Sequence, residues 1–295
     1  MTRVVGIGGG HGLAATLRAA RLYAADVAAV VTVADDGGSS GRLTRELGIP
    51  PPGDIRQCLC ALAEDEEMAA LYQHRFSRGE LTGHPAGNLV IAALAEMTGD
   101  FASAVDRAGA LLRARGRVLP ATTEIVGLHA HVDGGVVSGQ VAVATTNAAI
   151  HAVYLDPPAP AAHPDAVRAI AAADQIVLGP GSLFTSLIAT LLVPGIGAAV
   201  RSSGARRIFV CNSRRQKGET EDLDAAAHLD ALRAHAGDTC VDVVVVQHPE
   251  MPDAGVRADL AALEARGVEV VRTDVVGETG AHDPERLAAV LGALV

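Results

Sequence analysis

The N-terminal stretch constrains the fold more than any other part of the chain. Residues 3–7 are apolar and are followed by Gly8-Gly9-Gly10-His11-Gly12, an Ala/Leu-rich segment at 13–23 and a second apolar segment at 27–33. This order predicts a strand, a glycine loop, a helix and a second strand, which is a β-α-β unit of about thirty residues. The crossover of such a unit is expected to be right-handed and its two strands parallel. The chain is therefore expected to build an α/β fold on a parallel sheet.

The second half of the chain repeats the alternation of strands and helices. Pro164 is placed to begin a helix, and Ser182 is placed to cap another at 183–192. Strands are predicted at 175–178, 207–211, 241–246 and 268–271, and helices at 222–236, 257–266 and from Asp283-Pro284 to 290. In the first half, helical periodicity dominates residues 57–116, with segments at 58–70, 88–97 and 103–115.

Residues 117–155 have a different character. Apolar and polar residues alternate over 124–132, Asp133-Gly134 is a hairpin turn signal, and 136–144 predicts the returning strand, with a third strand at 150–155. We therefore predict a single α/β domain over residues 1–295. Its sheet is doubly wound and mainly parallel, with an antiparallel hairpin lobe at about 117–155.

Charge and composition exclude several classes of partner. The chain carries 24 basic and 34 acidic residues, a net charge of −10, which argues against nucleic acid or an anionic membrane as the main partner. Its N-terminus runs directly into a strand, and no segment approaches roughly 18 uncharged apolar residues, so neither a signal peptide nor a membrane span is expected. The four cysteines match no zinc spacing. These features predict a cytoplasmic protein.

The loop Gly8-Gly9-Gly10-His11-Gly12 is a candidate phosphate site. Glycines between a strand and a helix let backbone N–H groups point at an anion, and the helix N-terminus adds partial positive charge. Leu13 occupies the third glycine position of the dinucleotide fingerprint, and no Walker A lysine is present. A tight turn without a ligand remains the alternative. The acidic residues that end the second strand favour a nucleotide.

A cluster of polar residues follows that second strand. It lies in a glycine-rich run, expected to be loop rather than regular structure, and comprises Asp35, Asp36, Ser39, Ser40, Arg42, Asp54 and Arg56. Asp36 and Asp54, together with Asp35, are candidates either to hold Mg²⁺ or to accept sugar hydroxyls. Arg42 and Arg56 are suited to neutralise a phosphate, which argues against the alternative of a solvated acidic loop.

Gly179-Pro180-Gly181-Ser182 repeats the arrangement of strand, glycine turn and helix. Ligands of open α/β sheets bind at the carboxyl ends of the strands, so Gly179, Gly181 and Ser182 are expected to face the same crevice as the first glycine loop. His84 and Asn88 flank the start of a predicted helix and are candidates to contact the same ligand.

The remaining histidines point to no metal site. His129 and His131 lie on one face of a predicted strand, where they are expected to be hairpin surface. His282 precedes Asp283-Pro284 and is expected to be a neighbour of the helix cap. No Ser/His/Asp or Cys/His spacing typical of a catalytic nucleophile is present, and no catalytic residue is assigned.

Taken together, these motifs resemble the YvcK family of gluconeogenesis factors, which is related to the CofD 2-phospho-L-lactate transferases. The resemblance covers nearly the whole chain in order, and its most specific part is Asp35-Asp36-Gly37-Gly38-Ser39-Ser40-Gly41-Arg42. It implies a Rossmann-like fold and binding of the nucleotide sugar UDP-N-acetylglucosamine. It also implies a non-enzymatic role, the control of carbon flow, cell-wall synthesis and cell shape during growth on gluconeogenic carbon. A regulatory protein partner is compatible with that role, and the oligomeric state is left open.

The family pattern also implies roles for single residues and shows where this chain departs from it. Asn88, Ser182 and Asn212 would orient the base or the sugar of the ligand. The family usually has threonine at His11, and its Arg-His-Asp pattern appears here as Ala281-His282-Asp283. Because that missing arginine would bind the diphosphate, Arg214 or Arg215 is a candidate to replace it.

An enzyme is the alternative function. A CofD-like transferase would move phospholactate from a guanylyl carrier to a deazaflavin with the help of Mg²⁺. In those transferases the residues after Asp-Asp do not usually read Gly-Gly-Ser-Ser-Gly-Arg, which favours the regulatory protein. A nicotinamide dehydrogenase is less consistent with the chain, because the glycine fingerprint is missing.

Overall fold

The computed structural model describes residues 1–295, and its centre is a seven-stranded parallel sheet. The strand order is β10-β9-β8-β7-β1-β2-β3, and every neighbouring pair is parallel. The strands are β1 Arg3–Gly8, β2 Asp26–Val31, β3 Arg117–Pro120, β7 Gln175–Leu178, β8 Arg206–Val210, β9 Val243–Gln247 and β10 Glu269–Thr273. Because β1 pairs with β2 on one side and with β7 on the other, the chain winds outward in both directions. The doubly wound parallel sheet predicted from the sequence is confirmed.

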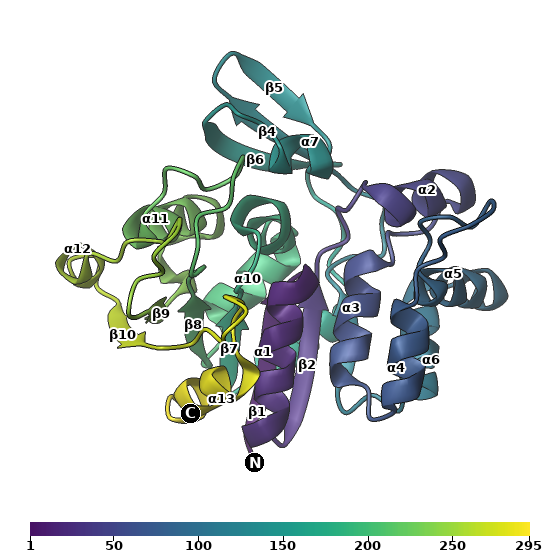
Figure 1. Ribbon diagram of the computed structural model, residues 1–295, viewed down its shortest axis with the longest axis horizontal. Helices are drawn as coiled ribbons and strands as arrows, with labels where there is room; N and C mark the ends of the chain where they lie inside the picture. The colour runs from purple at the N-terminus through teal and green to yellow at the C-terminus, as the bar shows by residue number, and fades with distance from the viewer.

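Helices cover both faces of this sheet (Figure 1). One hydrophobic core joins one face to α1 Gly10–Tyr23, α2 Gly38–Leu47, α3 Gly53–Leu62, α4 Glu66–Gln73, α5 Ala86–Thr98, α6 Phe101–Leu111 and α13 Pro284–Gly292. A second core joins the other face to α8 Pro164–Ala172, η1 Leu183–Ile188, α9 Ala189–Leu191, α10 Pro194–Ser202, α11 Ala225–Ala236 and α12 Leu260–Glu264. A short 3-10 helix, η2 Asp238–Cys240, precedes β9.

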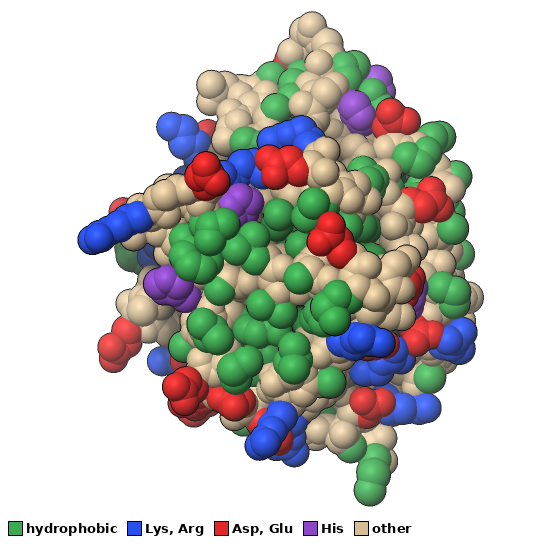
Figure 2. Space-filling model, turned by 90° about the vertical axis from the view of Figure 1, so that its right-hand side faces the viewer, with side chains coloured by type: hydrophobic (Ala, Val, Ile, Leu, Met, Phe, Trp, Pro, Cys, Tyr) green, Lys and Arg blue, Asp and Glu red, His purple; other side chains and the backbone are tan.

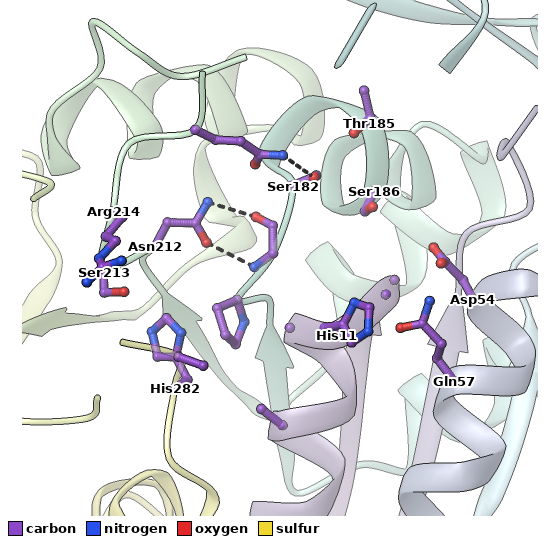
Figure 3. Close-up of a pocket in the computed structure, with 18 of the residues that line it drawn as sticks. His11, Asp54, Gln57, Ser182, Thr185, Ser186, Asn212, Ser213, Arg214 and His282 are labelled. Atoms are coloured by element: carbon purple, nitrogen blue, oxygen red, sulfur yellow. Dashed lines mark hydrogen bonds between the residues drawn. The ribbon is translucent and has the colours of Figure 1, made fainter. Parts of the chain in front are cut away.

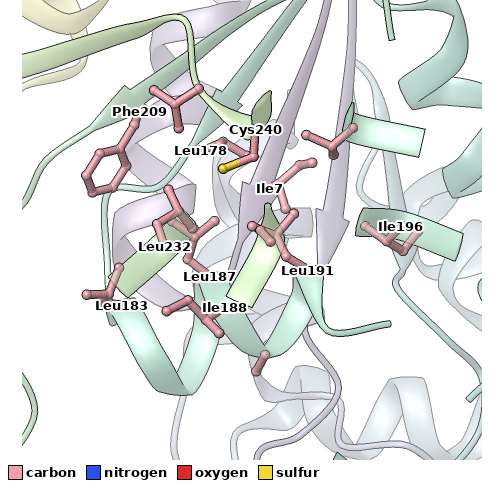
Figure 4. Packing of buried hydrophobic residues seen from close by; sticks show 14 of the residues in the cluster. Ile7, Leu178, Leu183, Leu187, Ile188, Leu191, Ile196, Phe209, Leu232 and Cys240 are labelled. Carbon is pink, nitrogen blue, oxygen red and sulfur yellow. The ribbon is translucent and has the colours of Figure 1, made fainter. Parts of the chain in front are cut away.

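Successive residues of the central strands enter opposite cores. In β1, Val4 belongs to one core and Val5 to the other, and in β9 Val243 and Val244 divide in the same way. Strands buried on both faces read as continuous apolar runs, which is why β9 is Val-Val-Val-Val-Gln. Figure 4 shows side chains of the second core, where Leu187 lies among residues of the sheet and of the helices. No single helix has the length and hydropathy to cross a membrane, although the bent pair Leu183–Leu191 and Pro194–Ser202 does by length and composition together.

A small antiparallel sheet stands apart from the main one, at the top of Figure 1. Its order is β5-β4-β6, with β4 Gly127–Val132, β5 Gly135–Ser138 and β6 Ile150–Asp156, so the predicted hairpin lobe is present. The returning strand is shorter than the predicted 136–144, because the chain turns at Gly139 and forms α7 Gln140–Ala144. Gly139 has φ 99°, a conformation that interrupts the strand and that glycine adopts readily.

The prediction that the glycine-rich runs are loops was wrong at two places. Helix α1 begins at Gly10, inside the expected loop, and α2 begins at Gly38, inside the run that follows Asp36. The α2 run is closely packed in the helix: a Cβ at Gly41 would lie 1.8 Å from the Asp36 carbonyl oxygen, and Ser40 Oγ accepts a hydrogen bond from the Gly53 N–H at 3.1 Å. Close packing therefore outweighs the low helix propensity of glycine.

Other element boundaries also differ from the sequence prediction. The helix expected at 58–70 is two helices, since Asp65 caps α4 by accepting a hydrogen bond from the Met68 N–H at 2.9 Å. The helix expected at 183–192 begins as the π-helical η1 and continues as α9, and the one at 257–266 is shortened to α12. Strand β3 and helix α10 were not predicted. Pro120 ends β3 at the edge of the sheet, where the missing N–H costs no ladder bond.

Candidate functional site

A cleft of about 740 Å³ opens at the carboxyl ends of β1, β2, β7 and β8. This is the point at which the strand order reverses, and open α/β sheets bind their ligands there. The lining residues are Gly9, Gly10, His11, Gly12, Ala15, Arg18, Thr32, Asp35, Asp54, Gln57, Gln140, Pro180, Gly181, Ser182, Thr185, Ser186, Asn212, Ser213, Arg214, Arg215, Gln216, Gly280, Ala281, His282 and Pro284. No aromatic ring of Phe, Tyr or Trp is among them, so a base bound here would be recognised by hydrogen bonds.

The two glycine turns predicted to share a crevice are in direct contact. A Cβ on Gly12 would lie 2.2 Å from the Pro180 carbonyl oxygen and 2.8 Å from Gly181 Cα. A Cβ on Gly181 would lie 3.5 Å from the Gly9 carbonyl oxygen. The turn after β1 can approach the turn after β7 this closely only because Gly12 has no side chain. One ligand can therefore touch both turns.

Side chains from the loop after β8 hold the second turn in place (Figure 3). Asn212 clamps Gly181, since its Oδ1 accepts from the Gly181 N–H at 3.0 Å and its Nδ2 donates to the Gly181 carbonyl oxygen at 2.9 Å. Gln216 Nε2 donates to Ser182 Oγ at 2.8 Å. The Ser182 hydroxyl makes no capping bond to η1, so the predicted cap was wrong. The amide of Asn212 shapes the turn that the ligand would meet.

The side chain of Glu219, rather than that of Ser182, forms hydrogen bonds to the first turn of η1. Its Oε1 accepts hydrogen bonds from the Thr185 N–H at 3.2 Å and from Thr185 Oγ1 at 2.5 Å. Glu219 is 6% exposed, and burial raises the pKa of its carboxyl group. The Glu219 carboxyl group therefore accepts a hydrogen bond from a backbone N–H near the start of η1. The sequence did not predict this contact.

Two carboxyl groups, Asp35 and Asp54, line the other side of the cleft. Burial, and then the neighbouring Asp35, raise the pKa of Asp54 to about 7, while a hydrogen bond from the Gly10 N–H acts in the opposite direction. Burial also raises the pKa of Asp35, opposed by the Gly37 N–H, which donates to Asp35 Oδ1 at 2.9 Å. At neutral pH the Asp54 carboxyl group is therefore close to the midpoint of its titration.

Arginines bring positive charge to the cleft at Arg18, Arg214 and Arg215. Arg214 forms no ion pair within the chain. A Cβ on Gly280 would lie 2.6 Å from Arg214 Nη2, so this guanidinium lies beside Ala281. The family has an arginine at the position of Ala281. Arg214 therefore lies where a substitute for that arginine is expected to lie. Arg18 was not predicted, although it follows His11 and Ala15 at the spacing of one helix face.

His282 also lines the cleft, where the sequence indicated only a neighbour of the helix cap. Burial lowers the pKa of its imidazole to about 4, and its Nε2 is buried without a hydrogen-bond partner. The imidazole is therefore neutral at physiological pH. No local signal in the sequence identifies it, because the loop before α13 reaches the cleft only through tertiary folding.

The structure does not bring every predicted site residue to the cleft. Nine of them line it: Gly9, Gly10, His11, Gly12, Asp35, Asp54, Gly181, Ser182 and Asn212. Gly8 and Gly179 lie just outside it, and the Gly179 carbonyl oxygen accepts a hydrogen bond from Thr16 Oγ1 at 2.7 Å. Asp36 faces α7, where its Oδ1 accepts from the Val141 N–H at 3.0 Å.

The remaining predicted residues, Ser39, Ser40, Arg42, Arg56, His84 and Asn88, lie outside the cleft. Ser39 Oγ lies 2.8 Å from His84 Nδ1 and accepts from Asn88 Nδ2 at 3.0 Å, and Ser40 likewise faces α3 rather than the cleft. Arg42 donates to the Thr82 carbonyl oxygen at 2.8 Å. Arg56 is 4% exposed, and burial lowers its pKa. The contacts of Ser39 with His84 and Asn88 join α2 to the beginning of α5.

No cluster of three or more His, Cys, Asp or Glu side chains that could hold a metal ion exists in the structure. The cysteines are all buried and unpaired. On the small sheet, His129 and His131 lie against Tyr154, with ring centroids 5.2 and 5.1 Å apart.

Comparison with known proteins agrees with this architecture. The sequence model of the family described as 2-phospho-L-lactate transferase CofD matches residues 4–276. A gluconeogenesis factor of Bacillus subtilis is 42% identical over 301 residues, which cover 96% of this chain and 95% of that protein. A crystal structure of a UPF0052 family member from Bacillus halodurans superposes with a TM-score of 0.95 at 39% identity, over 98% of each chain.

Proposed function

Because the chain belongs to the CofD family and is similar to a gluconeogenesis factor over nearly its whole length, we propose that its cleft binds UDP-N-acetylglucosamine as a regulatory ligand. In this role the protein would adjust carbon flow, cell-wall synthesis and cell shape during growth on gluconeogenic carbon. The name of the Bacillus subtilis relative supports the connection with carbon metabolism.

The observation that carries this proposal is the contact between the two glycine turns at the reversal of strand order. The turns after β1 and β7 present adjacent backbone to one cleft, and α1 begins at that point. The cleft volume of about 740 Å³ lies within the range of small-molecule sites and exceeds what a free phosphate needs. A nucleotide sugar, which carries its diphosphate between the nucleoside and the sugar, is compatible with a cleft of this volume.

Charge is distributed unequally along the cleft. In Figure 3, Arg214 lies on one side, Asp54 on the other, and His11 between them. Guanidinium groups bind phosphate oxygens, whereas carboxyl groups accept hydrogen bonds from sugar hydroxyls. We therefore place the diphosphate between Arg214 and the Gly9–Gly12 turn, and the hydroxyl-rich part of the ligand against Asp35 and Asp54.

Mg²⁺ is an accessory ligand in this proposal. Asp35 and Asp54 both line the cleft, whereas Asp36 is hydrogen-bonded to α7, so we assign any Mg²⁺ to the first two residues. Two carboxylates leave an octahedral ion short of oxygens, and a phosphate of the ligand with water would have to complete the shell. Unchanged binding in EDTA would remove the cation from the proposal and leave both residues as hydroxyl acceptors.

Calorimetry and thermal unfolding with UDP-N-acetylglucosamine, UDP, GDP and GTP test the proposal. UDP-N-acetylglucosamine at a hundred times its Kd should raise the free energy of unfolding by about 2.7 kcal/mol. Arg214→Gln should weaken binding at least about tenfold, the loss of one charge-assisted contact. The matched control is Arg42→Gln, which lies outside the cleft and should leave binding unchanged. No response of the wild-type protein to either uridine compound would refute the proposal.

The transferase named by the family model is the second candidate function. The observation in its favour is the pair Asp35 and Asp54, since a phospholactate transfer from a guanylyl carrier to a deazaflavin would use Mg²⁺. Stabilisation by guanine nucleotides with Mg²⁺, and by no uridine compound, would favour this enzyme over the regulatory protein.

A further inference from the structure

The small sheet β5-β4-β6 leaves one of its two faces open to solvent. Alternate residues of a strand point to opposite faces, and Leu128 and Val153 on the inner face are buried. On the outer face His131 and Tyr154 are exposed, and Val136 is 52% exposed. An antiparallel sheet with one solvated face normally carries polar side chains there. The aromatic and apolar residues of the outer face mark it as a surface that another molecule contacts.

Three rings of this outer face form an aromatic platform. His129 and Tyr154 are direct cross-strand neighbours, with ring centroids 5.2 Å apart and ring planes 16° from parallel. His131 lies on the same side of β4, and its ring centroid is 5.1 Å from that of Tyr154. Because the rings pack against one another, the platform has its shape before any partner binds.

Two contacts fix the lobe that carries this platform. The Asp36 carboxylate accepts a hydrogen bond from the Val141 N–H of α7 at 3.0 Å. At the other edge of the small sheet, the Val153 N–H donates to His235 Nε2 of α11 at 3.0 Å. The lobe is therefore anchored to the main body of the protein on both sides.

The charge of the lobe selects the kind of partner. Residues 118–167 contain no Lys or Arg. Asp133 lies in the hairpin turn and Asp156 at the opposite end of the sheet, and neither forms an ion pair with an arginine or a lysine. In Figure 2 the uppermost part of the molecule, which is this lobe, shows apolar and histidine side chains but no Lys or Arg. Such a surface repels nucleic acid, an anionic membrane and an identical face of a second copy, and it attracts a basic partner.

Tyr154 and Asp156 are the best-defined anchor for a basic group. They are two residues apart on β6, so both side chains lie on the outer face, roughly 7 Å apart along the strand. A guanidinium group can stack on the ring of Tyr154 and at the same time form a bidentate pair with the Asp156 carboxylate. An extended segment of six or seven residues would cover the roughly 20 Å from this anchor to Asp133 at the far end of β4.

We propose that the outer face of the small sheet, formed by His129, His131, Val136, Tyr154 and Asp156, docks an extended, arginine-containing segment of a partner protein. One arginine of that segment stacks on Tyr154 and pairs with Asp156, and the following residues cover the platform toward the hairpin turn. These five residues lie outside the cleft, so the docking surface does not depend on the function proposed for the cleft.

Fluorescence anisotropy of a dye-labelled peptide of seven alternating arginine and valine residues tests the proposal on the purified full chain. The wild-type protein should bind this peptide, and the same peptide with glutamine in place of arginine at least about tenfold more weakly. Tyr154→Ala and Asp156→Asn should each weaken binding by about three- to tenfold, with an unchanged unfolding temperature. The matched controls Leu22→Ala and Glu264→Gln remove an exposed leucine of α1 and an exposed carboxylate of α12, and should bind like the wild type.

Absence of binding by the wild-type protein, or equal binding of the glutamine peptide, would overturn the proposal. Wild-type affinity in both Tyr154→Ala and Asp156→Asn would do the same. Displacement of the peptide by a single-stranded RNA oligonucleotide would assign the face to nucleic acid and refute a protein partner. Light scattering tests for a second copy: a smaller mass for Tyr154→Ala than for the wild type would make the face an interface between copies, against the proposal.

Discussion

Replacing Asp54 by asparagine is expected to stabilise the protein at neutral pH and to leave its stability near pH 4 unchanged. In the folded protein the pKa of Asp54 is raised from 3.8 to about 7, chiefly by burial. Between these two values the unfolded chain has already released the proton that the folded chain retains. The free energy of unfolding therefore falls as pH rises from about 4 to 7 and is constant above that.

The structure sets the size of this effect. A pKa difference of about 3 corresponds to about 4 kcal/mol at 1.36 kcal/mol for each pKa unit. One side of the Asp54 carboxyl group faces the cleft, where solvent screens part of the cost, so we expect about 1–3 kcal/mol. Asparagine keeps the oxygen that accepts from the Gly10 N–H and removes only the ionisation.

Urea unfolding of Asp54→Asn and the wild-type protein at pH 5, 6, 7 and 8 measures the difference. The gain should grow through this range and level off above pH 7. Asp174→Asn is the control of opposite sign: Arg3 lowers the pKa of Asp174 to about 2, so its contribution is present above pH 3.8 and is lost as pH falls toward 2. A gain in Asp54→Asn that is equal at pH 5 and pH 8, or a loss at pH 8, would refute the reasoning.

Two further predictions concern the glycine turns. Gly12→Ala should destabilise the protein by about 1–3 kcal/mol in denaturant unfolding, because its Cβ would lie 2.2 Å from the Pro180 carbonyl oxygen. Gly204→Ala, with nothing within 4 Å of the added Cβ, is its control and should be neutral. Asn212→Ala removes both hydrogen bonds to Gly181 and should cost about 1–3 kcal/mol by thermal unfolding. An Asn212→Ala protein as stable as the wild type would show that the turn holds its shape without the clamp.

About half of the candidate site could be predicted from the sequence. Gly9, Gly12 and Asp35 were found because each lies within a few residues of a strand end, and the carboxyl ends of parallel strands meet at one edge of a sheet. The same rule misplaced Arg42, which lies farther along the chain, where helix α2 carries it away from that edge. Distance from the strand end does not decide every placement, since Asp54 lines the cleft from the start of α3, whereas Asp36, close to the end of β2, faces α7.

The sequence by itself determined the parallel α/β fold and the position of the cleft, because apolar runs and glycine turns act over a few neighbouring residues. Only the tertiary structure decided that Arg18 and His282 line the cleft, that Glu219 holds the beginning of η1, and that the glycine-rich run after Asp36 is helical. These outcomes depend on contacts between segments far apart in the chain. Such contacts depend on how closely the helices and strands pack against one another, and a pattern of neighbouring residues in the sequence does not contain this information.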